Sequence, residues 1–333
     1  MKKIFLAIIV ISAYLAPTSG LAQDSARATE LKVTTLSTML TEFRGVGEWG
    51  YSALIEVDGK TILFDTGARP KTVLRNAEEL GIDLSIVETV IVSHHHWDHT
   101  GGLVTLRKTL QEANPMFLQQ AHVGKGIFLP RSIDPDAVAR MSQGGPPKEL
   151  IVKILDVRHK YEALGGKFIV HDGPYELQPG VWVTGPIPRV HDERNWTPFN
   201  RIEQDGSFAE DTIPEDQALI IDTDEGLVVV AGCGHAGIVN TMEYARKITG
   251  NTSILAVIGG FHMLNLTEEK VTWTGAKMRE FGVQHVVGAH CTGINAVTGV
   301  RKAAHLDRGT AVVGAVGTAF TVGLGIEAGF LTR

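Results

Sequence analysis

The stretch that decides the fold is Ser93-His94-His95-His96-Trp97-Asp98-His99-Thr100-Gly101-Gly102. The apolar run at residues 89–92 predicts a buried β-strand immediately before it, and the Gly-Gly pair predicts the start of a helix. Packing alone does not call for so many imidazoles in one loop, whereas zinc readily accepts imidazole nitrogen and carboxylate oxygen as ligands. The predicted metal ligands in this loop are His94, His96, Asp98 and His99.

These four residues divide into two pairs, which predicts two ions. His94 and His96 alternate along an extended segment, so both side chains point the same way and can hold one ion, whereas Asp98 and His99 face a second. Two zinc ions about 3.5–4 Å apart that share a hydroxide would provide a nucleophile at neutral pH. We therefore expect a hydrolase that attacks an ester, lactone, amide or phosphoester, with Asp98 as the catalytic residue that orients the hydroxide. Iron or manganese would fit the same ligands.

Three further strands are each expected to end in a loop that carries histidine. The strands span residues 227–231, 254–258 and 284–287, and the loops after them contain Cys233 and His235, then His262, then His290 and Cys291. In α/β folds ligands collect where strands end and loops begin. The recurrence predicts a single site at one edge of a sheet.

The rest of the chain is expected to support that edge. Residues 51–57 and 60–64 predict a hairpin across Asp58-Gly59, and it runs into Asp65-Thr66-Gly67. Helices are expected at residues 70–80 and 103–113, from after His235 to residue 249, and after Asn265 as N-cap. Residues 115–214 are expected to form strands that carry long loops.

The amino terminus predicts export. Met1-Lys2-Lys3, an apolar stretch at residues 4–16 and the small residues Gly20 and Ala22 are typical of a signal peptide over residues 1–22. We expect a secreted, periplasmic protein in which residues 23–333 form a single domain with no stable membrane insertion after cleavage; an uncleaved anchor is the alternative. The net charge of −6 lies in no obvious block, which favours a small-molecule substrate over nucleic acid.

A resemblance to a known family supports the same metal site. The stretch from Ser93 to Gly102 is similar to the signature of the metallo-β-lactamase superfamily, which includes glyoxalase II and tRNase Z. Leu63-Phe64-Asp65-Thr66-Gly67 resembles that superfamily's first motif, in which the aspartate buttresses the histidine loop without binding metal. The resemblance implies a four-layer αβ/βα sandwich with the dinuclear metal site at the sheet edge.

Within the superfamily, residues 31–322 resemble one subgroup. Its name is 7,8-dihydropterin-6-methyl-4-(β-D-ribofuranosyl)aminobenzene-5′-phosphate synthase, and the likeness lies in residues 232–238, 259–262 and 290–293. A dihydropterin-type transferase is therefore an alternative function. A noncatalytic metal-binding sensor is another, and a β-lactamase proper ranks low because fold does not choose substrate.

The chain departs from the superfamily pattern at two ligands. Most members carry a histidine shortly before the strand at 217–221, but this chain has none at residues 213–216, so His235 is the expected third ligand of the first ion. His290 resembles the histidine that completes the second. Cys233 occupies the position of the bridging aspartate, and either its thiolate binds metal or Asp216 bridges instead.

Two residues near the predicted ligands are expected to interact with the centre indirectly. His262 is expected to support a ligand or contact the substrate, in preference to binding metal itself. Cys291 is expected to lie near Cys233, with a disulfide between them only when the site is empty.

Overall fold

The computed structural model describes residues 26–133, 153–197, 200–204 and 206–333. The signal peptide expected at residues 1–22 lies outside these ranges, so export stays a prediction. Within the described ranges no helix is both long and apolar enough to cross a lipid bilayer.

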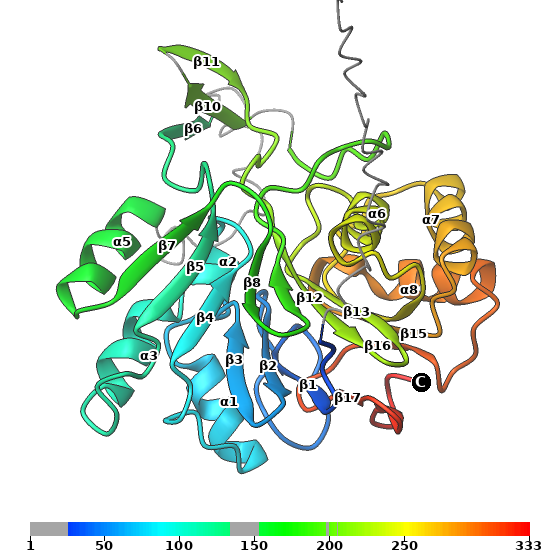
Figure 1. Ribbon diagram of the computed structural model, residues 1–333, viewed down its shortest axis with the longest axis horizontal. Helices are drawn as coiled ribbons and strands as arrows, with labels where there is room; N and C mark the ends of the chain where they lie inside the picture. Colours follow the sequence, from blue (N-terminus) through cyan, green and yellow to red (C-terminus); the bar gives the residue numbers. More distant parts are fainter. Residues whose placement is uncertain (1–25, 134–152, 198–199, 205) are drawn as a thin grey trace, which may run out of the picture.

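Two large sheets face each other at the centre of the molecule (Figure 1). The first contains, in spatial order, β18 (Gly325–Glu327), β17 (Ala319–Thr321), β1 (Leu31–Ser37), β2 (Ser52–Val57), β3 (Lys60–Phe64), β4 (Thr89–Val92), β5 (Gln120–Gly124) and β7 (Lys167–His171). The second contains β16 (Ala311–Val313), β15 (His285–Gly288), β14 (Ile254–Gly259), β13 (Gly226–Ala231), β12 (Ala218–Thr223), β9 (Val181–Val183) and β8 (Tyr175–Gln178). A small separate sheet contains β11 (Ser207–Glu210), β10 (Asn200–Gln204) and β6 (Arg131–Ile133).

Helices cover the outer face of each large sheet (Figure 1). On the first sheet lie α1 (Thr72–Leu80), α3 (Leu103–Leu110) and α5 (Ile154–Ala163), and the short α2 (Trp97–Thr100) follows β4. On the second lie α6 (Ile238–Thr249), α7 (Glu268–Glu280) and α8 (Ile294–Ala303), and the 3-10 turn η2 (His290–Thr292) follows β15. The layers are therefore helix, sheet, sheet and helix, which is the predicted four-layer sandwich.

Three buried apolar clusters hold these layers together. One lies between the two sheets and includes Tyr51, Phe64 and Ile258. The other two lie between a sheet and its own helices, around Met242 on one side and Leu106 on the other. Burial of this apolar area is the main driving force for the fold.

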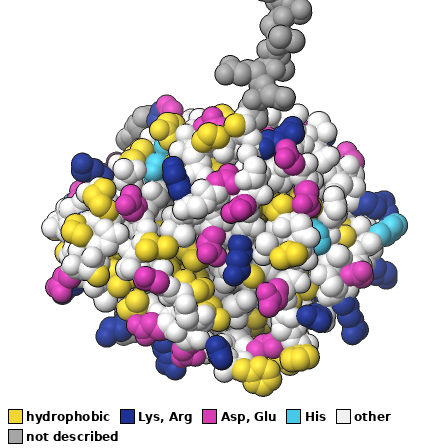
Figure 2. All heavy atoms as spheres, turned by 60° about the horizontal axis from the view of Figure 1, so that its bottom comes forward, with side chains coloured by type: hydrophobic (Ala, Val, Ile, Leu, Met, Phe, Trp, Pro, Cys, Tyr) yellow, Lys and Arg dark blue, Asp and Glu magenta, His cyan; other side chains and the backbone are white. Residues whose placement is uncertain are grey.

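On the face seen in Figure 2, basic and acidic side chains are interspersed.

Strand direction brings the predicted loops together. Strands β3, β4, β5 and β7 run parallel to one another, as do β13, β14, β15 and β16. Because the carboxyl ends of parallel strands meet at one edge, the loops after β13, β14 and β15 open at one edge of the second sheet. The loop after β4 meets them there, since ligand atoms of His94 and His96 lie within 4.8 Å of His235. That edge is where the sequence predicted a metal site.

Three local expectations were wrong. Residues 115–214 contain α5, a helix that was not expected; its buried Ile154, Val157 and Tyr161 have helical spacing. The N-cap of α7 is Thr267, whose hydroxyl accepts a hydrogen bond from Lys270 N, and not Asn265. Helix α3 ends at Leu110, earlier than residue 113.

Candidate metal centre

Six side chains from three loops converge at the sheet edge in the two groups that were expected. His94, His96 and His235 form the first group, and Asp98, His99 and His290 form the second; within each group the potential ligand atoms lie within 4.8 Å of one another. The loop after β4 supplies four of these residues, the loop after β13 supplies His235, and η2 supplies His290. The structure thus brings together side chains that follow strands of both large sheets.

Cys233 lies between these groups. Its Sγ is 3.1 Å from His99 Nε2, and it forms a third compact group with His94 and His99. A fourth group joins Cys233 to His262 and Cys291, which confirms that the two cysteines are near neighbours. Both are free thiols in this structure.

Asp65 holds the histidine loop from behind. Its Oδ1 accepts a hydrogen bond from Ser93 N at 2.7 Å, and its Oδ2 accepts one from the Ser93 hydroxyl at 2.7 Å and one from His99 Nδ1 at 2.6 Å. Gly232 packs so close that a Cβ there would lie 2.6 Å from Asp65 Oδ2. These hydrogen bonds occupy both carboxylate oxygens of Asp65. Asp65 therefore supports the histidine loop and is not a member of the ligand groups.

The same contacts determine which imidazole nitrogens face the centre. Because a carboxylate only accepts, His99 carries its proton on Nδ1, which leaves Nε2 toward Cys233. The Ser93 hydroxyl donates to Asp65, so it accepts from His94 Nδ1 at 2.9 Å, and His94 Nε2 is directed to His96. Fixing the tautomer in this way is what outer hydrogen bonds do for metal-ligating histidines.

His235 is held in the same manner by a residue that the sequence analysis missed. Its Nδ1 donates to the main-chain carbonyl of Asn195, and the Asn195 side chain donates to Gly234 O at 3.1 Å. His235 Nε2 is buried without a hydrogen-bond partner, and the ring packs against His94 and His96. Every residue has a main-chain carbonyl, so the residue type at position 195 could not predict this contact.

Buried nitrogens without partners indicate that the centre fits metal ions. Besides His235 Nε2, Nδ1 of His290 is buried and lacks a hydrogen-bond partner. An unsatisfied buried polar atom costs about 1–3 kcal/mol, and a metal ion in either group would reduce that cost. The donor set of imidazoles, a carboxylate and a thiolate is one that zinc accepts.

Electrostatics in the first group favour metal binding. Burial lowers the pKa of His94, His96 and His235 well below the usual value, and the neighbouring imidazoles lower the pKa of each further. All three rings are therefore neutral near pH 7. Neutral imidazole is the form that binds metal.

The second ligand group carries a negative charge on the carboxylate of Asp98. Burial raises the pKa of Asp98, but His99 and His290 more than offset this and hold it well below its usual range. His290 Nε2 lies 3.3 Å from Asp98 Oδ2. Asp98 is thus a carboxylate at neutral pH and can act as a ligand or accept a hydrogen bond from a water molecule.

His95 contacts Glu215 and belongs to none of the ligand groups that the described residues form. Its Nδ1 lies 2.6 Å from Glu215 Oε1, and Arg131 donates to Glu215 Oε2 at 2.7 Å. Glu215 is fully buried; burial raises its pKa, but His95 and Arg131 outweigh this and lower it to about 2. This ion-pair network, which the sequence analysis missed, anchors the β4 loop to the segment before β12.

Asp216 remains beside the centre and outside the four ligand groups that the described residues form. Its Oδ2 accepts from Ala236 N at 2.6 Å, its Oδ1 has no partner, and burial raises its pKa to about 7. Cys233, which belongs to two groups, lies closer to the ligand atoms. The geometry therefore favours Cys233 over Asp216 as the residue between the two ligand groups.

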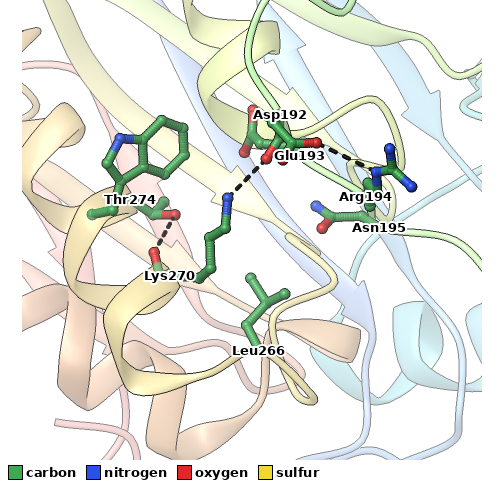
Figure 3. Close-up of a pocket in the computed structure, with 8 residues that line it drawn as sticks. Asp192, Glu193, Arg194, Asn195, Leu266, Lys270 and Thr274 are labelled. Carbon is green, nitrogen blue, oxygen red and sulfur yellow. Dashed lines mark hydrogen bonds and ion pairs between the residues drawn. The ribbon is translucent and has the colours of Figure 1, made fainter.

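A small cavity adjoins the centre through Asn195 (Figure 3). It has a volume of about 130 Å³ and lies between the segment 192–195 and residues of α7, with Lys270 Nζ donating to Asp192 O at 2.9 Å. Glu193 lines it and accepts hydrogen bonds from Val239 N and Asn240 N at the start of α6. The cavity holds none of the predicted ligands, but its wall supports the His235 loop.

The sandwich and the histidine centre together define a metallo-β-lactamase-fold protein, and the chain belongs to the metallo-β-lactamase superfamily, whose family model matches residues 50–246. It is similar to the 7,8-dihydropterin-6-methyl-4-(β-D-ribofuranosyl)-aminobenzene-5′-phosphate synthase of Methanocaldococcus jannaschii, with 32% identity over 74% of this chain and 82% of that protein.

Solved structures agree with this assignment. Tm1679, described as a metal-dependent hydrolase of the β-lactamase superfamily, superposes with a TM-score of 0.68 at 26% identity, over 87% of this chain and 98% of that one. The metallo-β-lactamase fold protein YhfI from Bacillus subtilis superposes with a TM-score of 0.51 at 14% identity, over 88% and 99% of the two chains. The second likeness shows the fold alone.

Proposed function

We propose that the chain is a metal-dependent hydrolase of an ester, lactone, amide or phosphoester bond in a small molecule. The observation that carries this proposal is the division of six ligand side chains into two adjacent groups, each within 4.8 Å. Two divalent ions bound there would supply an activated nucleophile at neutral pH and stabilise developing negative charge. Zinc is the ion we propose, and iron or manganese would fit the same donors.

The chain's own residues have distinct tasks in this proposal. Asp98 is anionic and lies at the edge of the centre, with 6% of its surface exposed, so it can accept a hydrogen bond from a water molecule and orient it toward the substrate. Asp65 and the Asn195 carbonyl keep His99 and His235 in the tautomers that leave Nε2 free. These positions are maintained before substrate arrives, which is the preorganisation that catalysis requires.

Three exposed apolar residues lie near the turn that carries His290. The ring of Trp49 packs edge-on against His290 at a centroid distance of 5.4 Å, and 46% of Trp49 is exposed. Leu264, 43% exposed, donates its N–H to Cys291 O, and the exposed Ile294 begins α8 just beyond η2. We infer that the substrate presents an apolar group to this side of the centre.

A transferase is the second candidate function, and the 32% identity to the dihydropterin-linked synthase favours it. In that case the same centre would act on a bond between a pterin-linked carbon and its leaving group. Binding of a pterin to the metal-loaded protein, measured by calorimetry, would support this candidate.

Hydrolysis can be tested directly. Zinc-reconstituted protein is assayed against a panel of esters, lactones, amides and phosphoesters, beside the His94→Ala variant as a metal-site control. Turnover that is lost in His94→Ala supports the proposal. Failure to hydrolyse any of these substrates despite full metal loading contradicts it, and would favour the transferase if a pterin binds or a noncatalytic metal-binding protein if none does.

A further inference from the structure

A sulfur-rich group adjoins the proposed two-ion centre, and two of its three residues, His262 and Cys291, have no role in the hydrolysis proposed above. Cys233, His262 and Cys291 come from the loops after β13, β14 and β15, and their ligand atoms lie within 4.8 Å of one another. The two cysteines are free and only 2% and 1% exposed. The group thus consists of two buried thiols and one imidazole.

The backbone brings these side chains together at close quarters. His262 has a φ of 47°, in the left-handed region, which a non-glycine residue adopts only when its surroundings hold it there. Met263 N donates to Cys291 O at 3.1 Å and so joins the two loops. A Cβ at Gly260 would lie 2.1 Å from Gly232 O and 3.0 Å from Cys291 Sγ, so glycine is needed for the loops to approach.

One polar atom of the group has no partner in the protein. His262 Nδ1 is buried and has no hydrogen-bond partner, whereas the Cys291 thiol donates to Cys233 O at 3.8 Å and Cys233 Sγ lies 3.1 Å from His99 Nε2. His262 also packs against His235, with ring centroids 4.6 Å apart. A buried imidazole nitrogen that has no partner and belongs to a residue grouped with two thiols indicates a position that a bound ion would satisfy.

We propose that Cys233, His262 and Cys291 bind a third metal ion of the thiophilic kind, beside the two ions of the hydrolytic centre. Two thiolates and an imidazole favour zinc, and they accept cobalt or cadmium as probes, over magnesium, calcium or manganese. Cys233 is shared, since it also groups with His94 and His99. Each thiol releases its proton to solvent when it binds the ion, because the thiolate is the ligand.

The test uses the full chain, reduced and freed of metal, and then titrated with cobalt(II). Bound cobalt is counted by elemental analysis after desalting, and thiolate ligation is followed by the thiolate-to-cobalt charge-transfer absorption in the near ultraviolet. We expect three equivalents in the wild type, with strong charge-transfer absorption. Cys291→Ser and His262→Asn should each bind two, and Cys291→Ser should lose part of the absorption.

A matched control is His285→Asn, at the opposite end of β15 from the centre, which should keep three equivalents. Retention of two equivalents by Cys291→Ser also shows that this variant is folded; if it is insoluble, His262→Asn carries the test alone. Only two equivalents in the wild type would overturn the inference, as would a third equivalent that both variants retain. A Cys233–Cys291 disulfide in the cobalt-loaded protein would overturn it as well.

This result is separable from the proposed function. Three equivalents without hydrolysis would contradict only the hydrolase, whereas hydrolysis with two equivalents would contradict only the third site.

Discussion

The carboxylate of Asp65 lies 2.6 Å from Nδ1 of His99, and neither residue is exposed to solvent. Because a carboxylate only accepts hydrogen bonds, Asp65 holds the proton of His99 on Nδ1 and directs Nε2 toward Cys233. The aspartate therefore determines both the orientation and the proton position of a predicted ligand without belonging to a ligand group.

Replacement of Asp65 by asparagine should weaken metal binding without unfolding the chain. The amide replaces one acceptor oxygen by an NH2 donor, so either Ser93 N at the Oδ1 position or the Ser93 hydroxyl and His99 Nδ1 at the Oδ2 position lose their acceptor. Loss of such an outer contact typically costs roughly 10–100-fold in metal affinity or activity. Competition with a chromophoric chelator measures the affinity, with Asp83→Asn, an exposed turn aspartate, as control. Equal affinity in Asp65→Asn and wild type would show that Asp65 is an ordinary turn residue.

His235→Ala should be as damaging to metal content and turnover as His96→Ala, because both belong to one ligand group. Either loss leaves an open coordination position on the same ion. His122→Ala serves as the control, since His122 pairs with His171 at 2.8 Å and joins no ligand group among the described residues. If His235→Ala kept the metal content and near-normal turnover of the wild type while His262→Ala lost turnover, the third ligand would have been assigned to the wrong residue.

Cys233 and Cys291 should form a disulfide only after metal is removed. Their sulfurs lie in one compact group, and dioxygen can oxidise the two thiols to a disulfide while it is reduced to hydrogen peroxide. Thiol counting by alkylation and mass spectrometry compares metal-loaded and chelated samples. Two freely alkylated cysteines in the chelated, air-exposed protein would refute the pairing, and a bridge in the fully metallated protein would exclude Cys233 as a ligand.

Glu193 should make the stability of the chain depend on pH in the neutral range. Burial raises its pKa from 4.5 to about 7, against the opposing hydrogen bonds from Asn240 and Val239. Because the folded-state pKa exceeds the unfolded one, this contribution to stability is complete below about 4.5 and is lost as pH rises through about 7. Urea unfolding at pH 5 and pH 8 should therefore show that wild type loses stability relative to Glu193→Gln. A difference between the two proteins that does not change with pH would contradict this.

Much of the centre could be predicted because strand ends are visible in sequence. An apolar run followed by histidine identifies His235 and His290 one at a time, and parallel pairing of β13, β14 and β15 then brings their loops together. The Asn195 carbonyl could not be predicted, because a main-chain acceptor 40 residues from His235 has no compositional signal. Helix α5 was missed because its three buried residues give too short a helical pattern beside a Gly- and Pro-rich run.

The central claim is that two ions bind at the edge of the sandwich, and metal stoichiometry tests it most directly. The chain is purified without chelator, reconstituted with zinc, desalted and measured by elemental analysis, beside His96→Ala and His290→Ala. We predict at least two equivalents per wild-type chain and the loss of one or more in each variant, since the variants remove a ligand from different groups. Fewer than two equivalents in the wild type would contradict a two-ion centre, and fewer than one would contradict metal binding at this site altogether.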